Sequence, residues 1–188
     1  VSNQIMESNP EMKIIVVDTL AASLGEAILI QKALDLKAQG KTIEETAEII
    51  NELVPHLITL FTVDDLDYLY RGGRLSKTTA IVGSLVNIKP ILRINEEGKL
   101  VAYSKVRGRN KSSQTLASMM EDYLGSYREK QLQIGIMHGD CEEDARALQK
   151  IIQDKYGYTD FFIEPIGPSI GAHSGPGTLG LVFLGDHR

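Results

Sequence analysis

Apolar residues along this chain follow two spacings, one typical of strands and one typical of helices. Short runs rich in β-branched and aromatic residues predict strands, and the first of these runs is predicted to be buried. These runs are residues 13–17, 56–62, 132–137, 161–166 and 179–184. Two further runs, 87–94 and 99–106, flank a four-residue turn that contains Gly98, and this arrangement predicts a β-hairpin.

Apolar residues that return every three or four positions predict helices over the longer segments. These segments are residues 22–39, 43–54, 64–70, 76–86 and 110–127, and a last one that follows Asp140 and runs to Ile152. Thr42 and Glu45 form a predicted capping box. Asn110, and Asp140 together with Glu143, are predicted to cap the last two helices.

The helix predicted over 110–127 carries Met119, Met120, Tyr123 and Tyr127 at helical spacing. Packing into a protein core is the more common cause of such a stripe, and a lipid-lining face is the alternative.

The order of the predicted elements indicates two architectures in one chain. Strand, two helices and strand over the first 62 residues resemble the edge of a parallel α/β layer, whereas a hairpin builds antiparallel sheet. The predicted fold class is therefore α/β plus α+β, a partial parallel layer followed by an α+β domain with a mainly antiparallel sheet. The predicted boundary divides residues 1–75 from residues 76–188.

Charge and composition exclude several function classes. The 188 residues have a formal net charge of -5, which does not favour nucleic-acid binding. No apolar run approaches the roughly 20 residues needed to cross a bilayer, so stable membrane insertion is not expected. The single cysteine, Cys141, allows neither an internal disulfide nor a multi-cysteine zinc site, which fits a reducing cytoplasm. No secretory signal is recognised, and the start at Val1 in place of a Met leads us to expect a processed product or a fragment.

The densest chemical signal is the glycine-rich segment 166–180, which contains Ser169, His173, Ser174 and Thr178. Backbone amides, hydroxyls and an imidazole can together hold a carboxylate or a phosphate. The alternative is a tight connector between two strands. Residues 175–180 also match G-x-G-x-x-G, but a predicted strand follows them directly, so dinucleotide binding is rejected.

Three other clusters are weaker. Arg71 and Arg74 flank a diglycine and can present a guanidinium fork to an anion, or they form a solvated basic turn. The basic run 105–111 is interpreted as a solvated strand end. Residues 138–141 contain metal-ligand types but only one cysteine, so no metal site is predicted.

Several of these motifs, taken in order, resemble the DegV family of bacterial fatty-acid-binding proteins. The motifs are Leu66-Asp67-Tyr68-Leu69, Gly72-Gly73-Arg74, Asn87-Ile88-Lys89-Pro90, Lys105-Val106-Arg107 and Gly171-Ala172-His173-Ser174-Gly175-Pro176-Gly177. The resemblance implies an α/β amino-terminal domain and an α+β carboxy-terminal domain. It also implies a long-chain fatty acid whose tail lies in an apolar tunnel of the second domain and whose carboxylate lies at the domain junction.

In the best-understood members of this family the protein is the acyl-carrying subunit of a fatty acid kinase. A separate ATP-dependent subunit makes the acyl phosphate for phospholipid synthesis. The resemblance therefore implies a non-catalytic lipid-binding protein that needs no cofactor or metal of its own. It places His173 in the carboxylate network and Arg74 near the head group and the kinase. The predicted ligand-binding residues are Arg74, Ser169, Gly171, His173, Ser174 and Gly175.

The family also has an amino-terminal strand and hydroxyl-bearing loops that provide the primary carboxylate contacts, and none of this precedes Val1. We therefore expect a member that lacks most of its first layer, with an exposed sheet edge that favours a dimer or larger homo-oligomer. Two alternatives stay open. One is a phosphoryl or acyl transferase that uses His173 and Arg74, and the other is a ligand-free structural fragment.

Overall fold

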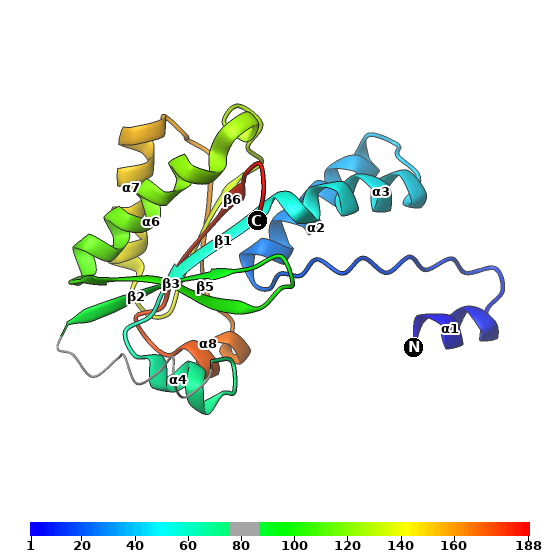
Figure 1. Ribbon diagram of the computed structural model, residues 1–188. Coiled ribbons are helices and arrows are strands. Elements are labelled where there is room, and N and C mark those ends of the chain that lie inside the picture. Colours follow the sequence, from blue (N-terminus) through cyan, green and yellow to red (C-terminus); the bar gives the residue numbers. More distant parts are fainter. Residues whose placement is uncertain (76–86) are drawn as a thin grey trace.

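A six-stranded sheet forms the centre of the computed structural model, which describes residues 1–75 and 87–188 (Figure 1). The strand order is β3-β2-β1-β6-β4-β5. The strands are β1 (Leu57–Thr62), β2 (Ile88–Ile94), β3 (Leu100–Arg107), β4 (Ile134–His138), β5 (Phe161–Pro165) and β6 (Leu179–Leu184). All neighbouring pairs are antiparallel except β4 with β5.

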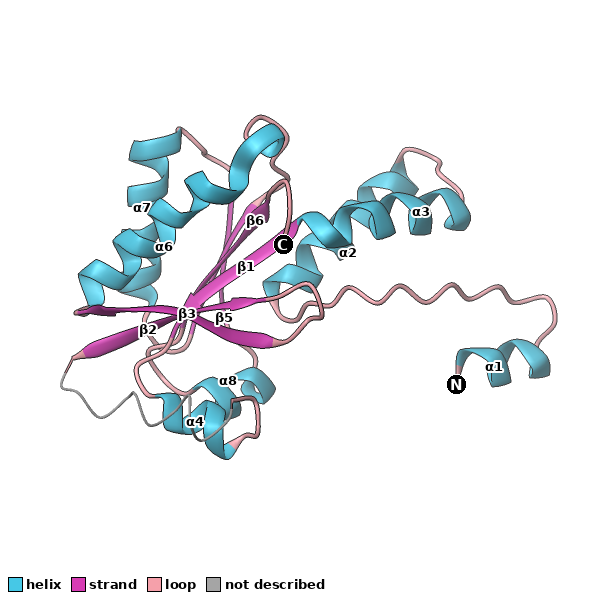
Figure 2. Ribbon diagram, viewed as in Figure 1, coloured by secondary structure: helices cyan, strands magenta, loops and turns pink. Residues whose placement is uncertain are grey.

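Helices cover both faces of this sheet (Figure 2). The described helices are α1 (Ser2–Ser8), α2 (Leu24–Ala38), α3 (Ile43–Leu53), α4 (Leu66–Arg71), α6 (Arg109–Leu124), α7 (Glu142–Tyr156) and α8 (Pro168–Ser174), with 3₁₀ turns at Val54–His56 and Gly125–Tyr127. Helices α6 and α7 lie on one face, α2 and α3 lie on the other, and α4 and α8 sit side by side near one end of the strands. Helix α1 stands apart from the sheet at the end of an extended segment.

The alternation of side chains along β1 explains why the whole strand is buried. Ile58 and Leu60 join the core beneath α6 and α7, whereas Leu57 packs with α2 and α3 and Phe61 packs with α4. Successive residues of a strand point to opposite faces, so a strand covered on both sides has no exposed position. The second face thus carries two separate apolar clusters, one under α2 and one beside α4.

The structure confirms the predicted fold class and most of the predicted elements. The hairpin and its turn become β2 and β3, and the capping box of Thr42 and Glu45 is present with both of its hydrogen bonds. Met119, Met120 and Tyr123 of the predicted stripe pack into the core with α7, as predicted for a packing face, whereas Tyr127 lies in a 3₁₀ turn and packs against the cluster of α2 and α3. The helix predicted over 76–86 lies outside the described residues.

Other predictions are wrong. Residues 13–17 are extended but form no strand, because no described strand hydrogen-bonds to them. The sequence also predicted that β1 lies at the edge of a parallel layer. This is wrong, because both neighbours of β1 run antiparallel to it. The parallel pairing is between β4 and β5. Asn110 and Asp140 do not cap helices: Gly108 and Cys141 occupy the two N-cap positions, without side-chain capping bonds.

The division at residue 75 stays a prediction, although β1 from the first part hydrogen-bonds to β2 and β6 from the second. Among the described residues, no helix has the length and apolar character that crossing a membrane requires.

Candidate functional site

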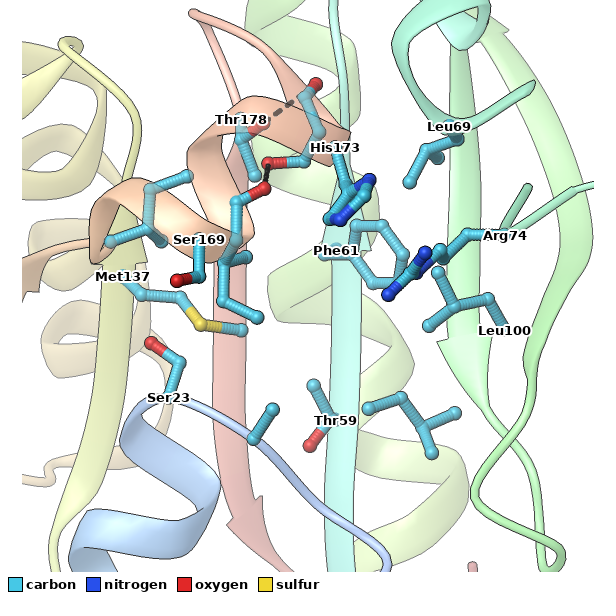
Figure 3. Close-up of a pocket in the computed structure, with 15 residues that line it drawn as sticks. Ser23, Thr59, Phe61, Leu69, Arg74, Leu100, Met137, Ser169, His173 and Thr178 are labelled. Carbon is cyan, nitrogen blue, oxygen red and sulfur yellow. Dashed lines mark hydrogen bonds between the residues drawn. The ribbon is translucent and has the colours of Figure 1, made fainter. Parts of the chain in front are cut away.

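A largely apolar pocket lies on the second face of the sheet, between the start of α2 and the paired helices α4 and α8 (Figure 3). Its volume is about 230 Å³. The pocket lies between the two apolar clusters of that face. The floor of the pocket is therefore the part of the sheet that neither α2 nor α4 covers. The lining residues are Ala22, Ser23, Thr59, Phe61, Leu69, Arg74, Ile94, Leu100, Met137, Ile166, Ser169, Ile170, His173, Ser174 and Thr178.

The glycine-rich segment folds into helix α8, which the sequence pattern did not predict. Pro168 occupies the first turn, where its missing N–H costs nothing, and Gly175 ends the helix with a φ of +78°. A Cβ at Gly175 would lie 2.6 Å from the ring of Tyr68 in α4, so only glycine allows the two helices to approach this closely. The helix thereby holds Ser169 and His173 over the pocket.

The diglycine turn and the end of α8 are in direct contact. A Cβ at Gly72 would overlap the His173 imidazole, so the ring packs on the bare backbone of that turn. Arg74 follows two residues later and donates a hydrogen bond from Nη1 to the Gly72 carbonyl at 2.6 Å. Figure 3 shows the Arg74 guanidinium and the His173 ring on the same side of the pocket, beside Phe61. The structure therefore brings these two predicted residues together.

Arg109 fixes the loop that follows α8. Its Nη1 donates to the Gly177 carbonyl at 2.7 Å, its Nε donates to Asp144 Oδ2 at 2.8 Å, and its Nη2 lies 3.1 Å from Cys141 Sγ. Only 17% of the Arg109 side chain is exposed. The interpretation of the basic run 105–111 as a solvated strand end is thus wrong for Arg109, which connects α6, α7 and the loop.

Cys141 lies on the same loop network. Its thiol donates to the Thr178 carbonyl at 3.2 Å. Burial raises the pKa of this thiol, and the neighbouring Arg109 guanidinium opposes the shift. A neutral thiol is a weak nucleophile, so the residue is suited to a structural role.

The polar groups of the pocket differ in whether they already form hydrogen bonds within the protein. Ser174 donates to the Ile170 carbonyl at 3.0 Å, and Thr178 donates to the Gly175 carbonyl at 2.7 Å. Ser169 is exposed on the first turn of α8. For the His173 ring and the Ser169 hydroxyl, no hydrogen bond is present within the described part of the chain. Arg74, His173 and Ser169 are therefore the groups best able to receive an anion.

The six predicted ligand-binding residues separate into two groups. Arg74, Ser169, His173 and Ser174 line the pocket. Gly171 and Gly175 do not line it; the Gly175 amide instead donates to the Gly171 carbonyl at 2.8 Å, within α8 and its C-cap. These two glycines contribute to the shape of the helix.

Several pocket residues were not singled out from the sequence, among them Ser23, Thr59, Phe61 and Met137. Ser23 has a φ of +55°, which is uncommon outside glycine, and it is the N-cap of α2. The predicted helix began at Ala22, two residues before the observed start at Leu24, and this hid the cap. Thr59, Phe61 and Met137 lie in predicted strands whose direction toward a pocket was not predicted.

Comparisons with known proteins agree with this arrangement. A family model described as "Uncharacterised protein, DegV family" matches residues 1–186. A DegV domain-containing protein of Clostridium perfringens is 43% identical over 185 residues, which are 98% of this chain and 63% of that protein. The chain thus spans just under two thirds of the length of the curated relatives it matches.

Two solved structures have the same fold. One is the fatty acid kinase (Fak) B3 protein of Streptococcus pneumoniae loaded with linoleic acid, with a TM-score of 0.88, 28% identity, and coverage of 98% of this chain and 64% of that chain. The other is a fatty acid binding DegV family protein of Streptococcus agalactiae, with a TM-score of 0.83, 29% identity and the same coverage of 98% and 64%.

Proposed function

This chain belongs to the DegV family, and we propose that it binds a long-chain fatty acid in the pocket between α8 and the sheet. The observation that supports this most directly is that one largely apolar cavity is lined by both Arg74 and His173. A small number of polar groups at one side of an apolar cavity is typical of a site for an amphipathic ligand.

The carboxylate is assigned to the space beside Arg74 and His173, with Ser169 as a hydroxyl donor. A carboxylate that leaves water needs charged or hydrogen-bonding partners, and a guanidinium can bind both of its oxygens. Ser174, Gly171 and Gly175 contribute by shaping α8, so all six predicted residues have a place in this proposal.

The acyl tail is assigned to the apolar floor formed by β1, β4 and β6. Each buried methylene contributes about 0.8 kcal/mol, so the tail supplies most of the affinity and the head group supplies orientation. The sheet and its helices provide this surface without a metal or a cofactor.

A non-catalytic carrier role follows from this assignment. The bound carboxylate is presented, in the cytoplasm, to a separate ATP-dependent kinase subunit that forms the acyl phosphate for phospholipid synthesis. The name of the Streptococcus pneumoniae relative, a fatty acid kinase B3 protein, supports this partner. With ATP and a fatty acid, the chain alone is expected to form no acyl phosphate. Turnover by the isolated chain that His173→Ala abolishes would favour the transferase alternative.

Displacement of a fluorescent fatty acid tests the binding site. Arg74→Ala is expected to weaken fatty-acid binding at least tenfold, because a hydrogen bond to a charged group contributes about 1.5–3 kcal/mol. Arg71→Ala is the matched control: Arg71 lies in the same turn, its side chain is 80% exposed, and it does not line the pocket. Equal affinity in the Arg74→Ala and parent proteins would contradict the head-group assignment. Absence of binding by the parent chain would contradict the function.

A further inference from the structure

The open part of the pocket floor is a row of three residues across β4, β6 and β1. Gly180 pairs with Met137 on one side and with Phe61 on the other. Directly paired residues of antiparallel strands project from the same face of a sheet. Met137 and Phe61 therefore stand on either side of a position that has no side chain, and the row contains a trough at Gly180.

The side chain of Met137 lies across this trough. A Cβ at Gly180 would be 2.5 Å from Met137 Cε and 2.8 Å from Met137 Cγ. Met137 is 7% exposed, and Figure 3 shows its thioether directed into the pocket. A methionine side chain is unbranched and has several rotatable bonds, so it adapts to the shape of its neighbours more readily than leucine or isoleucine.

The next row of the same face is closed at its β4 end. It contains Gly135, Val182 and Thr59. A Cβ at Gly135 would lie 3.0 Å from Ile28 Cδ1 and 3.3 Å from Leu24 Cβ, because α2 packs directly on the strand there. Thr59, at the β1 end of the row, still lines the pocket. On β4, Met137 is thus the last residue of this face that lines the pocket before α2 covers the strand.

We propose that Met137, supported on the bare backbone of Gly180, determines which acyl chains the pocket accepts. This inference rests on the proposed function. In its present position the Met137 thioether fills the trough at Gly180, and it contacts a straight, saturated acyl chain that lies on the pocket floor. Without the thioether the trough is open, and it accommodates the bend of a cis double bond. A misfit the size of one methylene changes selection by an apolar pocket about 10- to 200-fold.

The ratio of two dissociation constants tests this inference. The full chain is titrated with palmitate and with palmitoleate, which have the same length and differ by one cis double bond. Met137→Ala is expected to shift the ratio about tenfold toward palmitoleate. Met137→Leu keeps most of the side-chain volume and is expected to shift the ratio less than Met137→Ala does. Met119→Ala makes the same change in the core on the opposite face of the sheet, and it is expected to leave the ratio unchanged.

A second variant tests the contact with Gly180. Gly180→Ala is expected to weaken binding of both ligands about tenfold, because the new methyl group drives the thioether up into the pocket. In the double variant with Met137→Ala there is no thioether to displace, so affinity is expected to return. Such a recovery distinguishes a positioning role from general damage to the sheet, and thermal melting reports the fold of each variant.

The outcomes separate the two proposals. If the parent chain binds both ligands and Met137→Ala leaves their ratio unchanged, the role of Met137 is overturned and fatty-acid binding stands. If the parent chain binds neither ligand, the proposed function is overturned and this inference with it. Should Gly180→Ala fail to fold, the ratio measured for Met137→Ala decides alone.

Discussion

The contact between Gly72 and His173 leaves no room for a side chain at residue 72. The imidazole comes from the last turn of α8, whereas Gly72 comes from the turn after α4. Two segments about 100 residues apart thus meet at a single position. The geometry of the proposed head-group site depends on this glycine as much as on the two charged or titratable residues beside it.

Gly72→Ala is expected to displace the His173 ring and to weaken fatty-acid binding about tenfold, because a misplaced polar group loses its charge-assisted hydrogen bond. Displacement of a fluorescent fatty acid measures the effect. Gly167→Ala is the control, since its added methyl group would meet no described atom within 4 Å. The same loss of affinity in both variants would refute this explanation.

Sequence reasoning identified individual site residues unevenly. Arg74 and His173 were predicted because they belong to motifs that resemble those of the DegV family. Met137 and Thr59 were not, because each is one residue in a short buried strand. Whether such a residue faces a pocket depends on the pairing of rows across the sheet, and local sequence does not contain that information.

At the scale of elements, Arg109 ties α6 to α7 and to the loop after α8. Its three nitrogen atoms are directed at groups from two segments, the start of α7 and the loop after α8. A planar guanidinium can satisfy such a divergent set, and an ammonium group cannot. The position of α8 therefore depends on Arg109, which is the first residue of α6.

Arg109→Ala is expected to lower the free energy of unfolding by about 2 kcal/mol, because the Gly177 carbonyl and the Asp144 carboxylate lose a charged donor. Urea unfolding measures the change. Arg146→Ala is the control: Arg146 pairs with Glu142 on the exposed face of α7, and such pairs contribute roughly 0.3–0.5 kcal/mol. A loss at Arg109 no larger than that of the control would contradict the bridging role.

Elements with a clear period were predicted, and elements that depend on distant contacts were not. The strands at 57–62 and 179–184 and the hairpin follow directly from local patterns. Helix α8 does not, because a short segment with Pro168 and Gly171 has low intrinsic helix propensity and is held by packing on α4. Residues 13–17 have the composition of a strand, but a strand also needs a hydrogen-bonded neighbour.

At the scale of the whole molecule, exposed apolar side chains lie both on α2 and on the extended segment before it. Val16 is 71% exposed, Ile30 is 54% exposed and Leu34 is 53% exposed. Residues 13–17 also present backbone groups that no described strand pairs with. Extended backbone beside exposed apolar side chains favours association with another chain.

A dimer or larger assembly is therefore expected, with a mass by light scattering above the 20.7 kDa of one chain. Val16→Lys is expected to shift the population toward the monomer, because it places a charge in the proposed contact. Tyr103→Lys puts the same charge on an exposed position of β3, away from this surface, and is expected to have no effect. A monomeric parent chain across the concentration range would contradict the prediction.

The strand order has a consequence for when the acyl site comes into existence. The floor of the pocket forms only when β6 lies between β1 and β4. In the pairing of β1 with β6, Leu57 lies opposite Leu184. During synthesis, β1 and β4 leave the ribosome well before β6, and contacts between such distant segments form slowly. A growing chain has no floor on which to hold a lipid. Under the proposed function, the fatty acid therefore binds only after β6 has paired with β1 and β4, and it then stabilises the folded protein by mass action.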